Sequence, residues 1–310
     1  MTNEDLKTMQ AWPLERKIRV SQLRIMEWYQ HWGGKVYVSF SGGKDSTVLL
    51  DLARRVYPDI EAVFCDTGLE YPEIKSFAKA HKNTTVIKPK MRFDEVIEKY
   101  GYPVISKENS QKICEIRTTK SQKLLDIRLN GGYKGKSWKL PEKWKFLINA
   151  PFKISSRCCD VMKKYPMKTY QKRTGKSPII GTMASESCLR KTDWVRHGCN
   201  AFDAKAPTSK PLSFWTEQDV LKYLKITGLK YCPVYGEIKE QQQQAMAFLE
   251  KKLYTTGADR TGCMFCMFGV HLEKEPNRFQ RMKITHPKQY DYCINKLGCG
   301  AVLDYIDVPY

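Results

Sequence analysis

Two periodicities of apolar residues alternate along the first hundred residues. Short, nearly continuous apolar runs are typical of strands buried on both faces, and each is followed by apolar positions at helical spacing. The strands predicted are 35–41, 60–68 and 84–90, and the helices predicted are 13–32, 46–57, 71–82 and 91–101. Strands that alternate with helices predict a parallel sheet with right-handed crossovers.

The regularity weakens after residue 102. Within the basic stretch of about 103–150, the segment GGYKGKSWKLPEKWK is predicted to be a long loop or small insertion, and loops of this length are usually functional or mobile. Further predicted elements are a helix at 155–173, a strand followed by a loop at 177–187, a helix at 216–228 with Thr216 as N-cap, and a helix over the glutamines 241–244.

The pattern divides the chain into three parts. We expect an N-terminal helix over 1–34, a nucleotide-binding domain over 35–230 with the basic insertion at about 103–150, and a cysteine-containing extension over 231–310. The fold class predicted is α/β, with a doubly wound, mostly parallel sheet and a C-terminal helical or metal-binding extension.

Composition narrows the class of protein. The chain has 310 residues, of which 42% are hydrophobic and 28% charged, as in soluble globular proteins. No apolar run is as long as a membrane span and the start, MTNEDLK, is polar, so we expect a cytoplasmic protein with no membrane partner. In reducing conditions, the 11 cysteines favour metal ligation or thiol chemistry over disulfides.

The positive charge is concentrated in one segment. The net charge is +20, and residues 107–176 alone contain 19 basic and 5 acidic residues. Aromatic residues interleave with these cations: Tyr133, Trp138, Trp144, Phe146, Phe152, Tyr165 and Tyr170. Clustered cations with aromatics suit a nucleic acid, either DNA or tRNA, while a solvated basic face with ordinary core aromatics is the alternative.

The stretch SFSGGKDSTVLL lies between the first predicted strand and the next helix. Glycines in such a turn let backbone N–H groups and a helix N-terminus approach phosphate. Lys44 can neutralise a phosphate, Asp45 can hold Mg²⁺ or orient the loop, and Ser39, Ser41 and Ser46 can donate to phosphate oxygens. The spacing fits neither the Walker A motif nor G-x-G-x-x-G.

The hexapeptide SGGKDS at 41–46 resembles the PP-loop of the ATP pyrophosphatase superfamily, whose fold is adenine nucleotide alpha-hydrolase-like. FCDTGLEYPE at 64–73, GTMASESCLR at 181–190 and PLSFWTEQDVLKYL at 211–224 resemble segments of phosphoadenosine phosphosulfate (PAPS) reductase-like proteins. The resemblance implies binding of ATP with Mg²⁺, or of APS or PAPS, by Ser39, Ser41, Gly42, Gly43, Lys44, Asp45, Ser46, Asp66, Thr67, Gly181, Glu186 and Arg190.

Two cysteine pairs suggest a metal site. Cys158 and Cys159 are adjacent, and Cys263 and Cys266 form C-x-x-C. Paired thiolates at this spacing ligate zinc or iron–sulfur clusters, and unliganded core cysteines are the alternative. The combination resembles the [4Fe–4S] site of adenosine phosphosulfate (APS) reductases, with zinc as runner-up. The flanking cations Arg157, Arg260 and Lys163 can offset the charge of a cluster.

The C-terminal tail departs from the reductases. They carry a catalytic cysteine in an E-C-G-x-H type motif, whereas this tail reads KLGCGAVLDYIDVPY. Cys299, between glycines, and Cys188, beside the implied substrate loop, are the candidate nucleophiles; a buried, inert thiol is the alternative for each.

Three functions are compatible with these features. The first is ATP-driven sulfur insertion into nucleic acid, with Lys44 and Asp45 as catalytic residues. The sulfur would come from a persulfide donor protein. The second is an APS or PAPS reductase that releases sulfite and uses a thiol reductant protein. The third is a nucleotide-sensing accessory protein that binds nucleic acid without turnover. The basic segment and the altered tail favour the first, and the sequence leaves the oligomeric state open.

Overall fold

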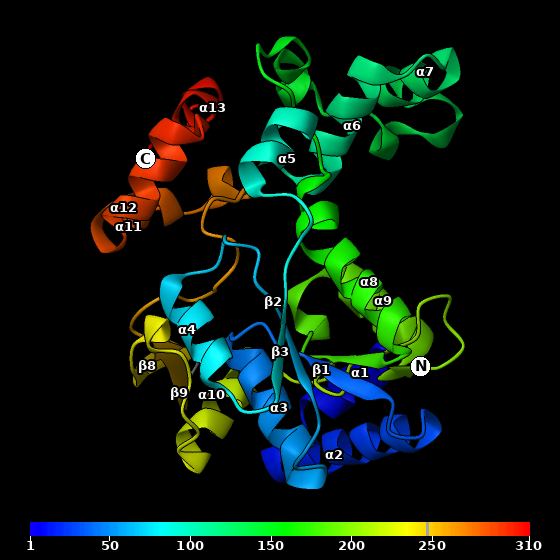
Figure 1. The fold of residues 1–310 in the computed structure, drawn as a ribbon, viewed down its shortest axis with the longest axis vertical. Coiled ribbons are helices and arrows are strands. Elements are labelled where there is room, and N and C mark those ends of the chain that lie inside the picture. The colour runs from blue at the N-terminus through cyan, green and yellow to red at the C-terminus, as the bar shows by residue number, and fades with distance from the viewer. Residues whose placement is uncertain (246–247) are drawn as a thin grey trace. The chain divides into compact units, whose positions relative to one another are not determined.

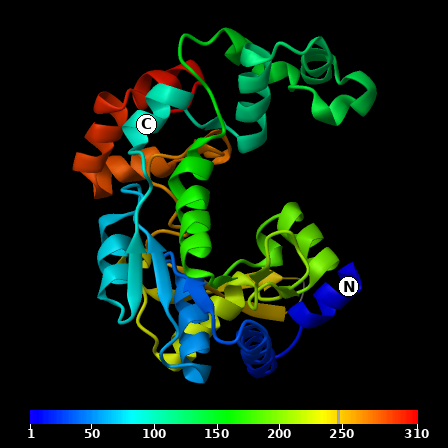
Figure 2. The same ribbon diagram turned by 45° about the vertical axis from the view of Figure 1, so that its right-hand side comes forward.

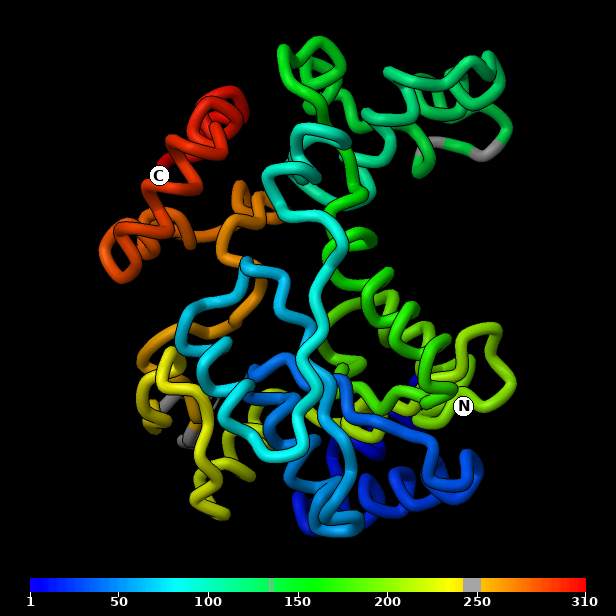
Figure 3. Tube along the Cα trace, viewed as in Figure 1, coloured from blue at the N-terminus to red at the C-terminus, as the bar shows by residue number. Residues whose placement is uncertain are grey.

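The computed structural model describes residues 1–245 and 248–310, and the chain forms two compact units. Unit 1 comprises Met1–Asp66, Glu70–Ile87 and Met167–Thr261, and unit 2 comprises Thr67–Leu69, Lys88–Pro166 and Gly262–Tyr310. The trace in Figure 3 allows each passage of the chain between the units to be followed by residue colour. This division differs from the three consecutive segments predicted, because both units are assembled from separate stretches of the chain.

Unit 1 is built on a six-stranded sheet of order β3-β2-β1-β5-β7-β6 (Figure 1), in which all neighbours are parallel except β6 and β7. Its strands are β1 (Val36–Ser39), β2 (Ala62–Cys65), β3 (Thr84–Ile87), β5 (Ser177–Ile180), β6 (Asn200–Ala201) and β7 (Thr208–Ser209). Its helices are α1 (Asn3–Gln10), α2 (Leu14–His31), α3 (Lys44–Val56), α4 (Pro72–Ala80), α9 (Cys188–His197) and α10 (Glu217–Thr227), with short 3-10 turns η5 (Ala184–Glu186) and η6 (Pro233–Tyr235). The predicted α/β class with a mostly parallel sheet is confirmed.

Helices cover both faces of this sheet. Consecutive strand residues point to opposite sides, so a continuous apolar strand has side chains to bury on both faces. Val36 and Val38 of β1 belong to the main buried cluster, which also contains Trp28 of α2 and residues of α3 and α10. Tyr37, between them, packs on the other face with Val63 and with Tyr170 of α8 (Tyr165–Thr174). The central strands β1, β2 and β5 are therefore mostly buried, as their apolar runs predicted, whereas the edge strand β3 is partly exposed. Figure 2 shows the helices packed about the sheet.

The order in which the strands are added to the sheet changes direction at β1. Strand β1 pairs with β2 on one side and with β5 on the other, so the chain leaves β1 at a topological switch point. Ligands of open α/β sheets bind outside the carboxyl ends of the strands at such a point. The glycine-rich stretch after β1 occupies this position.

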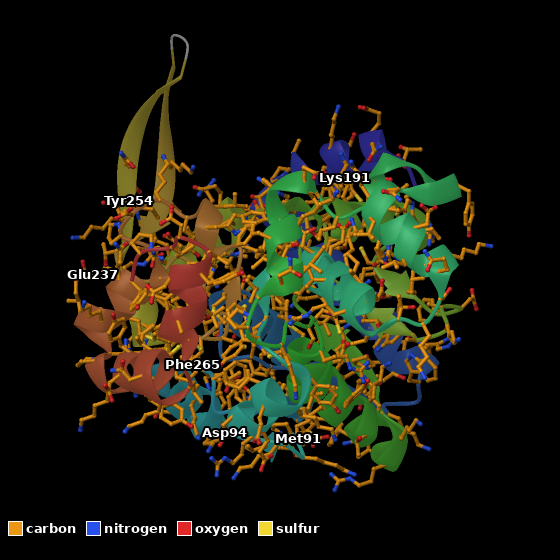
Figure 4. All side chains as sticks on the ribbon, turned by 90° about the horizontal axis from the view of Figure 1, so that it is seen from above. Met91, Asp94, Lys191, Glu237, Tyr254 and Phe265 are labelled. Carbon is orange, nitrogen blue, oxygen red and sulfur yellow. The ribbon has the colours of Figure 1, made fainter. Side chains whose placement is uncertain are left out.

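Unit 1 also carries an antiparallel hairpin, β8 (Ile238–Ala245) and β9 (Phe248–Thr255). Figure 4 shows its two strands side by side, with Tyr254 on β9. The glutamines 241–244 lie in β8, so the helix predicted for them is wrong. Cross-strand pairing, for example of Gln241 with Lys252, outweighs the helical preference of glutamine, which is a weak determinant by itself.

Unit 2 is mainly helical. Its helices are α5 (Phe93–Tyr100), α6 (Lys107–Thr118), α7 (Gln122–Asn130), α11 (Arg278–Thr285), α12 (Pro287–Asp291) and α13 (Cys299–Tyr305). Shorter 3-10 and π turns are η1 (Gly132–Lys134), η2 (Lys136–Trp138), η3 (Glu142–Asn149), η4 (Asp160–Lys164), η7 (Val270–Leu272) and η8 (Tyr292–Lys296). Parallel pairing of β4 (Val104–Ile105) with β10 (Met267–Phe268) joins its two long segments.

The basic insertion is more ordered than predicted. Two helices, α6 and α7, begin at the N-cap residues Ser106 and Ser121, whose hydroxyls accept from the backbone N–H of Asn109 and Leu124. These Ser caps are local signals that the weak apolar periodicity obscured. Within the described part of the chain, no helix combines the length and apolar character that crossing a bilayer requires.

A buried ion pair fixes the N-terminal helices on unit 1. The Lys17 ammonium of α2 donates to Asp219 at 2.6 Å and to the Gln10 carbonyl at 2.7 Å. Asp219 also accepts from the Thr216 N–H at 2.7 Å, which closes the predicted cap of α10. One carboxylate thus serves both the helix cap and the buried cation.

We expect Asp219→Ala to destabilise the protein by about 3 kcal/mol or more, because the Lys17 charge would remain buried without its partner. Urea unfolding measures the change. Asp203→Ala, an exposed aspartate of the same unit, is the control and should shift the unfolding free energy by less than about 0.5 kcal/mol. Equal stability of the two variants would contradict the role assigned to Asp219.

Candidate functional site

The glycine-rich loop places its backbone where no side chain would fit. Gly43 is the N-cap of α3, and Gly42 has φ 73°, in the left-handed region. A Cβ on Gly42 would lie 3.0 Å from the Ile74 carbonyl oxygen of α4. A Cβ on Gly43 would lie 3.1 Å from the Tyr235 hydroxyl. A side chain is therefore disfavoured at Gly42 by both its φ and the backbone contact, and a side chain at Gly43 would have to displace the Tyr235 hydroxyl.

The loop hydroxyls hold the loop in shape. Ser46 Oγ donates to the Gly43 carbonyl at 2.9 Å and lies 3.0 Å from Ser41 Oγ, and Thr47 Oγ1 donates to the same carbonyl at 3.0 Å. Ser39 is the last residue of β1. The predicted contacts of Ser39, Ser41 and Ser46 with phosphate stay predictions; what the structure shows for Ser41 and Ser46 is a local bracing role.

Lys44 is buried and held by neighbours distant in sequence. Its ammonium lies 3.0 Å from Glu217 Oε1 and donates to the Asp259 carbonyl at 2.8 Å. Its backbone N–H, the first of α3, donates to the Tyr235 hydroxyl at 3.2 Å. Both the cation and the amide at the helix start therefore have polar partners that an anionic ligand can replace.

Asp45 has an orphaned oxygen: Oδ1 is buried and has no hydrogen-bond partner among the described residues. Burial raises the pKa of the Asp45 carboxyl, although Lys44 acts in the opposite direction. A carboxylate oxygen without a donor at a phosphate-binding loop suits Mg²⁺, which prefers oxygen ligands and binds through one or two carboxylates plus substrate phosphates.

Two arginines meet at Glu186 beside the loop. Arg260 donates to Glu186 Oε1 at 2.6 Å, and Arg190 forms an ion pair with Oε2. Burial and the neighbouring Arg260 lower the pKa of the Arg190 guanidinium. Two guanidinium groups that share one carboxylate form a site with spare positive charge, suited to phosphate oxygens. Gly181 packs behind the loop, where a Cβ would lie 3.3 Å from the Asp45 carbonyl oxygen.

Arg260 is paired with Glu186 within unit 1. Its predicted role in offsetting the charge of a cluster held by the cysteines stays a prediction.

Asp66 and Thr67 fall on different sides of the unit division. Asp66, buried after β2, is paired with the ammonium groups of Lys75 and Lys79 at 3.1 and 3.0 Å. Burial alone would raise the pKa of Asp66, but the hydrogen bonds from Lys79 and Lys75 outweigh it and lower the pKa. Thr67 Oγ1 accepts from the Leu69 N–H at 3.2 Å. Contact of either residue with a nucleotide stays a prediction.

The four candidate ligand cysteines all belong to unit 2. Burial raises the pKa of the Cys158 thiol, and the nearby Cys263, Cys159 and Cys266 raise it further, whereas Lys163 lowers it. Four neighbouring thiols, two of them from C-x-x-C, match the donor chemistry of a Cys₄ site. However, the described residues contain no set of three or more Cys, His, Asp or Glu side chains arranged to hold a metal ion.

Backbone contacts shape the C-x-x-C turn. The Cys266 N–H donates to the Cys263 carbonyl at 3.2 Å, and Arg278 donates to the Cys266 carbonyl at 2.9 Å. Met264 and Phe265, between the cysteines, are buried. Two apolar side chains are therefore buried within the C-x-x-C turn.

The two candidate nucleophiles occupy different environments. Cys299 is fully buried beside the fully buried Cys293, and the hydrogen bond from Cys299, together with burial, raises the pKa of Cys293. A thiol without solvent exposure has no route to a substrate in this conformation, so the inert alternative fits Cys299. Cys188 is exposed at the first position of α9, capped by Ser187.

Sequence reasoning missed Glu217, Tyr235 and Asp259, which contact Lys44. They lie roughly 170–220 residues further along the chain, and only the fold brings them to the loop. Glu217 stands inside the matched PLSFWTEQDVLKYL segment, which was the one available signal.

The family model described as phosphoadenosine phosphosulfate reductase domain matches residues 35–128 and 135–268. An uncharacterized protein of Methanocaldococcus jannaschii is 24% identical over 291 residues, which cover 92% of this chain and 53% of that protein. Adenosine 5'-phosphosulfate reductases of Staphylococcus haemolyticus and Geobacillus kaustophilus are 35% and 30% identical over 31% of this chain and 42% and 43% of theirs. The chain thus spans about half the length of the curated relatives it matches.

Solved structures with a similar arrangement include a phosphoadenylyl-sulfate reductase from Candida auris in complex with phosphate. It has a TM-score of 0.40 and 14% identity and covers 75% of this chain and 90% of that one. A U34-tRNA thiolase from Methanococcus maripaludis with its [4Fe-4S] cluster has a TM-score of 0.35 and 15% identity, over 70% and 66% of the two chains.

We expect Lys44→Ala to weaken ATP binding by roughly 10- to 100-fold, because it removes one charge-assisted hydrogen bond to phosphate. Glu217 is more than half exposed and can be hydrated, so the fold should persist. Calorimetric titration with ATP and Mg²⁺ measures the change, and circular dichroism checks the fold. Lys222→Ala, an exposed lysine of α10, is the control; unaltered ATP affinity in Lys44→Ala would remove the lysine from the site.

Proposed function

The chain belongs to the phosphoadenosine phosphosulfate reductase domain family, and we propose that it uses ATP to insert sulfur into a nucleic acid. The family and its relatives support a nucleotide-binding function connected with sulfur. The observation that carries the proposal is the glycine loop at the sheet switch point, with Lys44, the orphaned Asp45 oxygen and two arginines around it.

These residues suit the release of pyrophosphate. In the proposed reaction, an oxygen of the nucleic acid attacks the α-phosphorus of ATP, and the bond to the β-phosphate bridging oxygen breaks. Lys44, Arg190 and Arg260 would neutralise the leaving pyrophosphate, and Asp45 would hold its Mg²⁺. Preorganised cations stabilise the charge that develops on this leaving group more than they stabilise bound ATP.

The second half-reaction needs sulfur from outside the chain. The terminal sulfur of a persulfide on a donor protein would displace AMP from the activated carbon. A second thiol would then attack the sulfur of the donor cysteine. This breaks the sulfur–sulfur bond, leaves the transferred sulfur on the carbon and forms a disulfide between the donor cysteine and the second thiol. Cys158, Cys159, Cys263 and Cys266 would hold a [4Fe–4S] cluster, which would supply an iron site for sulfur binding. Zinc on the same thiols is the alternative occupant.

The nucleic-acid acceptor is supported by the charge of unit 2. Its segment 107–166 contains 15 basic and 5 acidic residues. Backbone phosphates provide the complementary charge, and binding to them weakens steeply with salt.

Sulfonucleotide reduction is the second candidate, because the curated relatives include adenosine 5'-phosphosulfate reductases. It requires a thiolate that reaches the sulfuryl sulfur. The burial of Cys299 counts against it, and the exposed Cys188 is the remaining candidate.

Pyrophosphate release from ATP, measured with and without tRNA or DNA, tests the proposal. We expect stimulation by nucleic acid of at least about tenfold, within the range that positioning of a second substrate provides. The Lys44→Ala variant should show no stimulation of pyrophosphate release by nucleic acid. Sulfite release from APS or PAPS with a thiol reductant would favour the second candidate, and salt-dependent nucleic-acid binding without turnover of either nucleotide would favour a nucleotide-sensing accessory protein.

Cys263→Ser should lose the bound iron of anaerobically purified protein, because one of four thiolate ligands is removed. Elemental analysis and visible absorbance measure the loss. Cys114→Ser, on α6 of the same unit, is the matched control and should keep its iron. Zinc in place of iron would assign the site to zinc, and equal iron content in the two variants would contradict the ligand role of Cys263.

A further inference from the structure

A row of aromatic rings runs through unit 2. We call it the aromatic strip: Trp144, Phe146, Tyr305 and Phe152. Successive ring centroids are 6.2, 5.7 and 5.4 Å apart. Trp144, Phe146 and Phe152 come from η3 and the segment after it, and Tyr305 ends α13, so the fold assembles the strip from distant parts of the sequence.

Part of the strip faces solvent. The exposed fractions are 43% for Phe146 and 37% for Tyr305, whereas Leu147, next to Phe146, and Leu303, two residues before Tyr305, are fully buried. Arg117 of α6 donates to the carbonyls of Ala150 and Phe152 at 2.8 and 2.7 Å, which fixes the segment that carries the rings. The two exposed rings are thus held in place by a buried and hydrogen-bonded support.

Charged residues of both signs flank the rings. The Lys143 ammonium lies 5.1 Å from the centroid of the Trp144 ring, and Lys145 pairs with the exposed Glu142 at 3.1 Å. Residues 139–153 contain four lysines and one glutamate, whereas residues 299–310 contain two aspartates and no lysine or arginine. Asp304, beside Tyr305, accepts from the Tyr310 hydroxyl at 3.0 Å. The segment 139–153 therefore combines the exposed Phe146 ring with an excess of positive charge.

We propose that the aromatic strip binds unpaired bases of a single-stranded nucleic acid, with Phe146 and Tyr305 stacking on bases and Lys143 and Lys145 contacting phosphates. The inference rests on the proposed function, for which it specifies the acceptor as an unpaired region. Aromatic stacking accepts any base because every base has a π face, and the bases of a duplex are already stacked on one another. Charge complementarity favours this ligand over an uncharged protein surface.

Fluorescence anisotropy of labelled oligonucleotides tests the proposal. The probes are a DNA and an RNA of one mixed sequence, each single-stranded and each annealed to its complement. Wild-type protein should bind the single strands more tightly than the duplexes. Phe146→Ala and Tyr305→Ala should each weaken single-strand binding by roughly 5- to 100-fold without changing the salt slope, and comparison of DNA with RNA tells which strand is preferred.

Matched variants separate stacking from charge and from general damage. Phe146→Tyr should bind like wild type and Phe146→Leu like Phe146→Ala, because only the former keeps a ring. Lys143→Ala should reduce the salt slope by about 0.7. Tyr254→Ala, at an exposed tyrosine of β9 in unit 1 with a similar exposed fraction of 40%, should have no effect.

Tighter binding of duplex, or wild-type affinity in Phe146→Ala and Tyr305→Ala, would overturn the proposal, and so would equal affinity of Phe146→Leu and Phe146→Tyr. These outcomes are independent of the proposed reaction. If single strands bind through the strip but pyrophosphate release is absent, the proposed reaction is refuted and the binding role of the strip is supported. If nucleic acid stimulates pyrophosphate release while the strip variants keep wild-type affinity, the binding role of the strip is refuted and the proposed reaction is supported.

Discussion

The close passage of the chain at Gly42 and Gly43 is the constraint on which unit 1 depends. Strand β1 ends at the switch point of the sheet, and the backbone turns there within contact of the Ile74 carbonyl and the Tyr235 hydroxyl. Any side chain at either position would push these neighbours away. The same absence of side chains brings the amide groups at the start of α3 to the surface on which a phosphate can bind.

Charges around this loop are balanced within the protein. Lys44 is paired with Glu217, and Arg190 and Arg260 share Glu186. An incoming triphosphate has to replace these carboxylates, so part of its interaction energy is used to break existing pairs. The buried Lys44, the partly exposed Arg190 and the exposed Arg260 are all paired in the absence of ligand. Once Lys44 is released, these three cations provide two more positive groups than Glu186 alone can neutralise.

Unit 2 gathers residues that are widely separated in the chain. Cys158 and Cys159 come from the end of the basic insertion, and Cys263 and Cys266 come from the segment that follows the hairpin β8–β9. The pairing of β4 with β10 and the contact of Arg278 with the Cys266 carbonyl hold the second pair in place. In the same unit, the ends of η3 and α13 meet to form the aromatic strip. The candidate metal ligands and the aromatic strip therefore belong to unit 2, and the glycine loop belongs to unit 1.

Local patterns in the sequence determined the strands β1, β2, β3 and β5, the glycine loop and the Thr216 cap of α10. Apolar runs such as 35–41 predicted buried strands, and the glycines at 42 and 43 predicted that the backbone there lies close to its neighbours. The glutamines 241–244 were misassigned because strand pairing with residues 249–252 is not a local property. Only the tertiary structure decided that Glu217 and Tyr235 contact Lys44, that Arg260 pairs with Glu186, and that Cys299 is buried. The physical reason is that periodicity and turn chemistry act over a few residues, whereas ion pairs and burial depend on which distant segments the fold brings together.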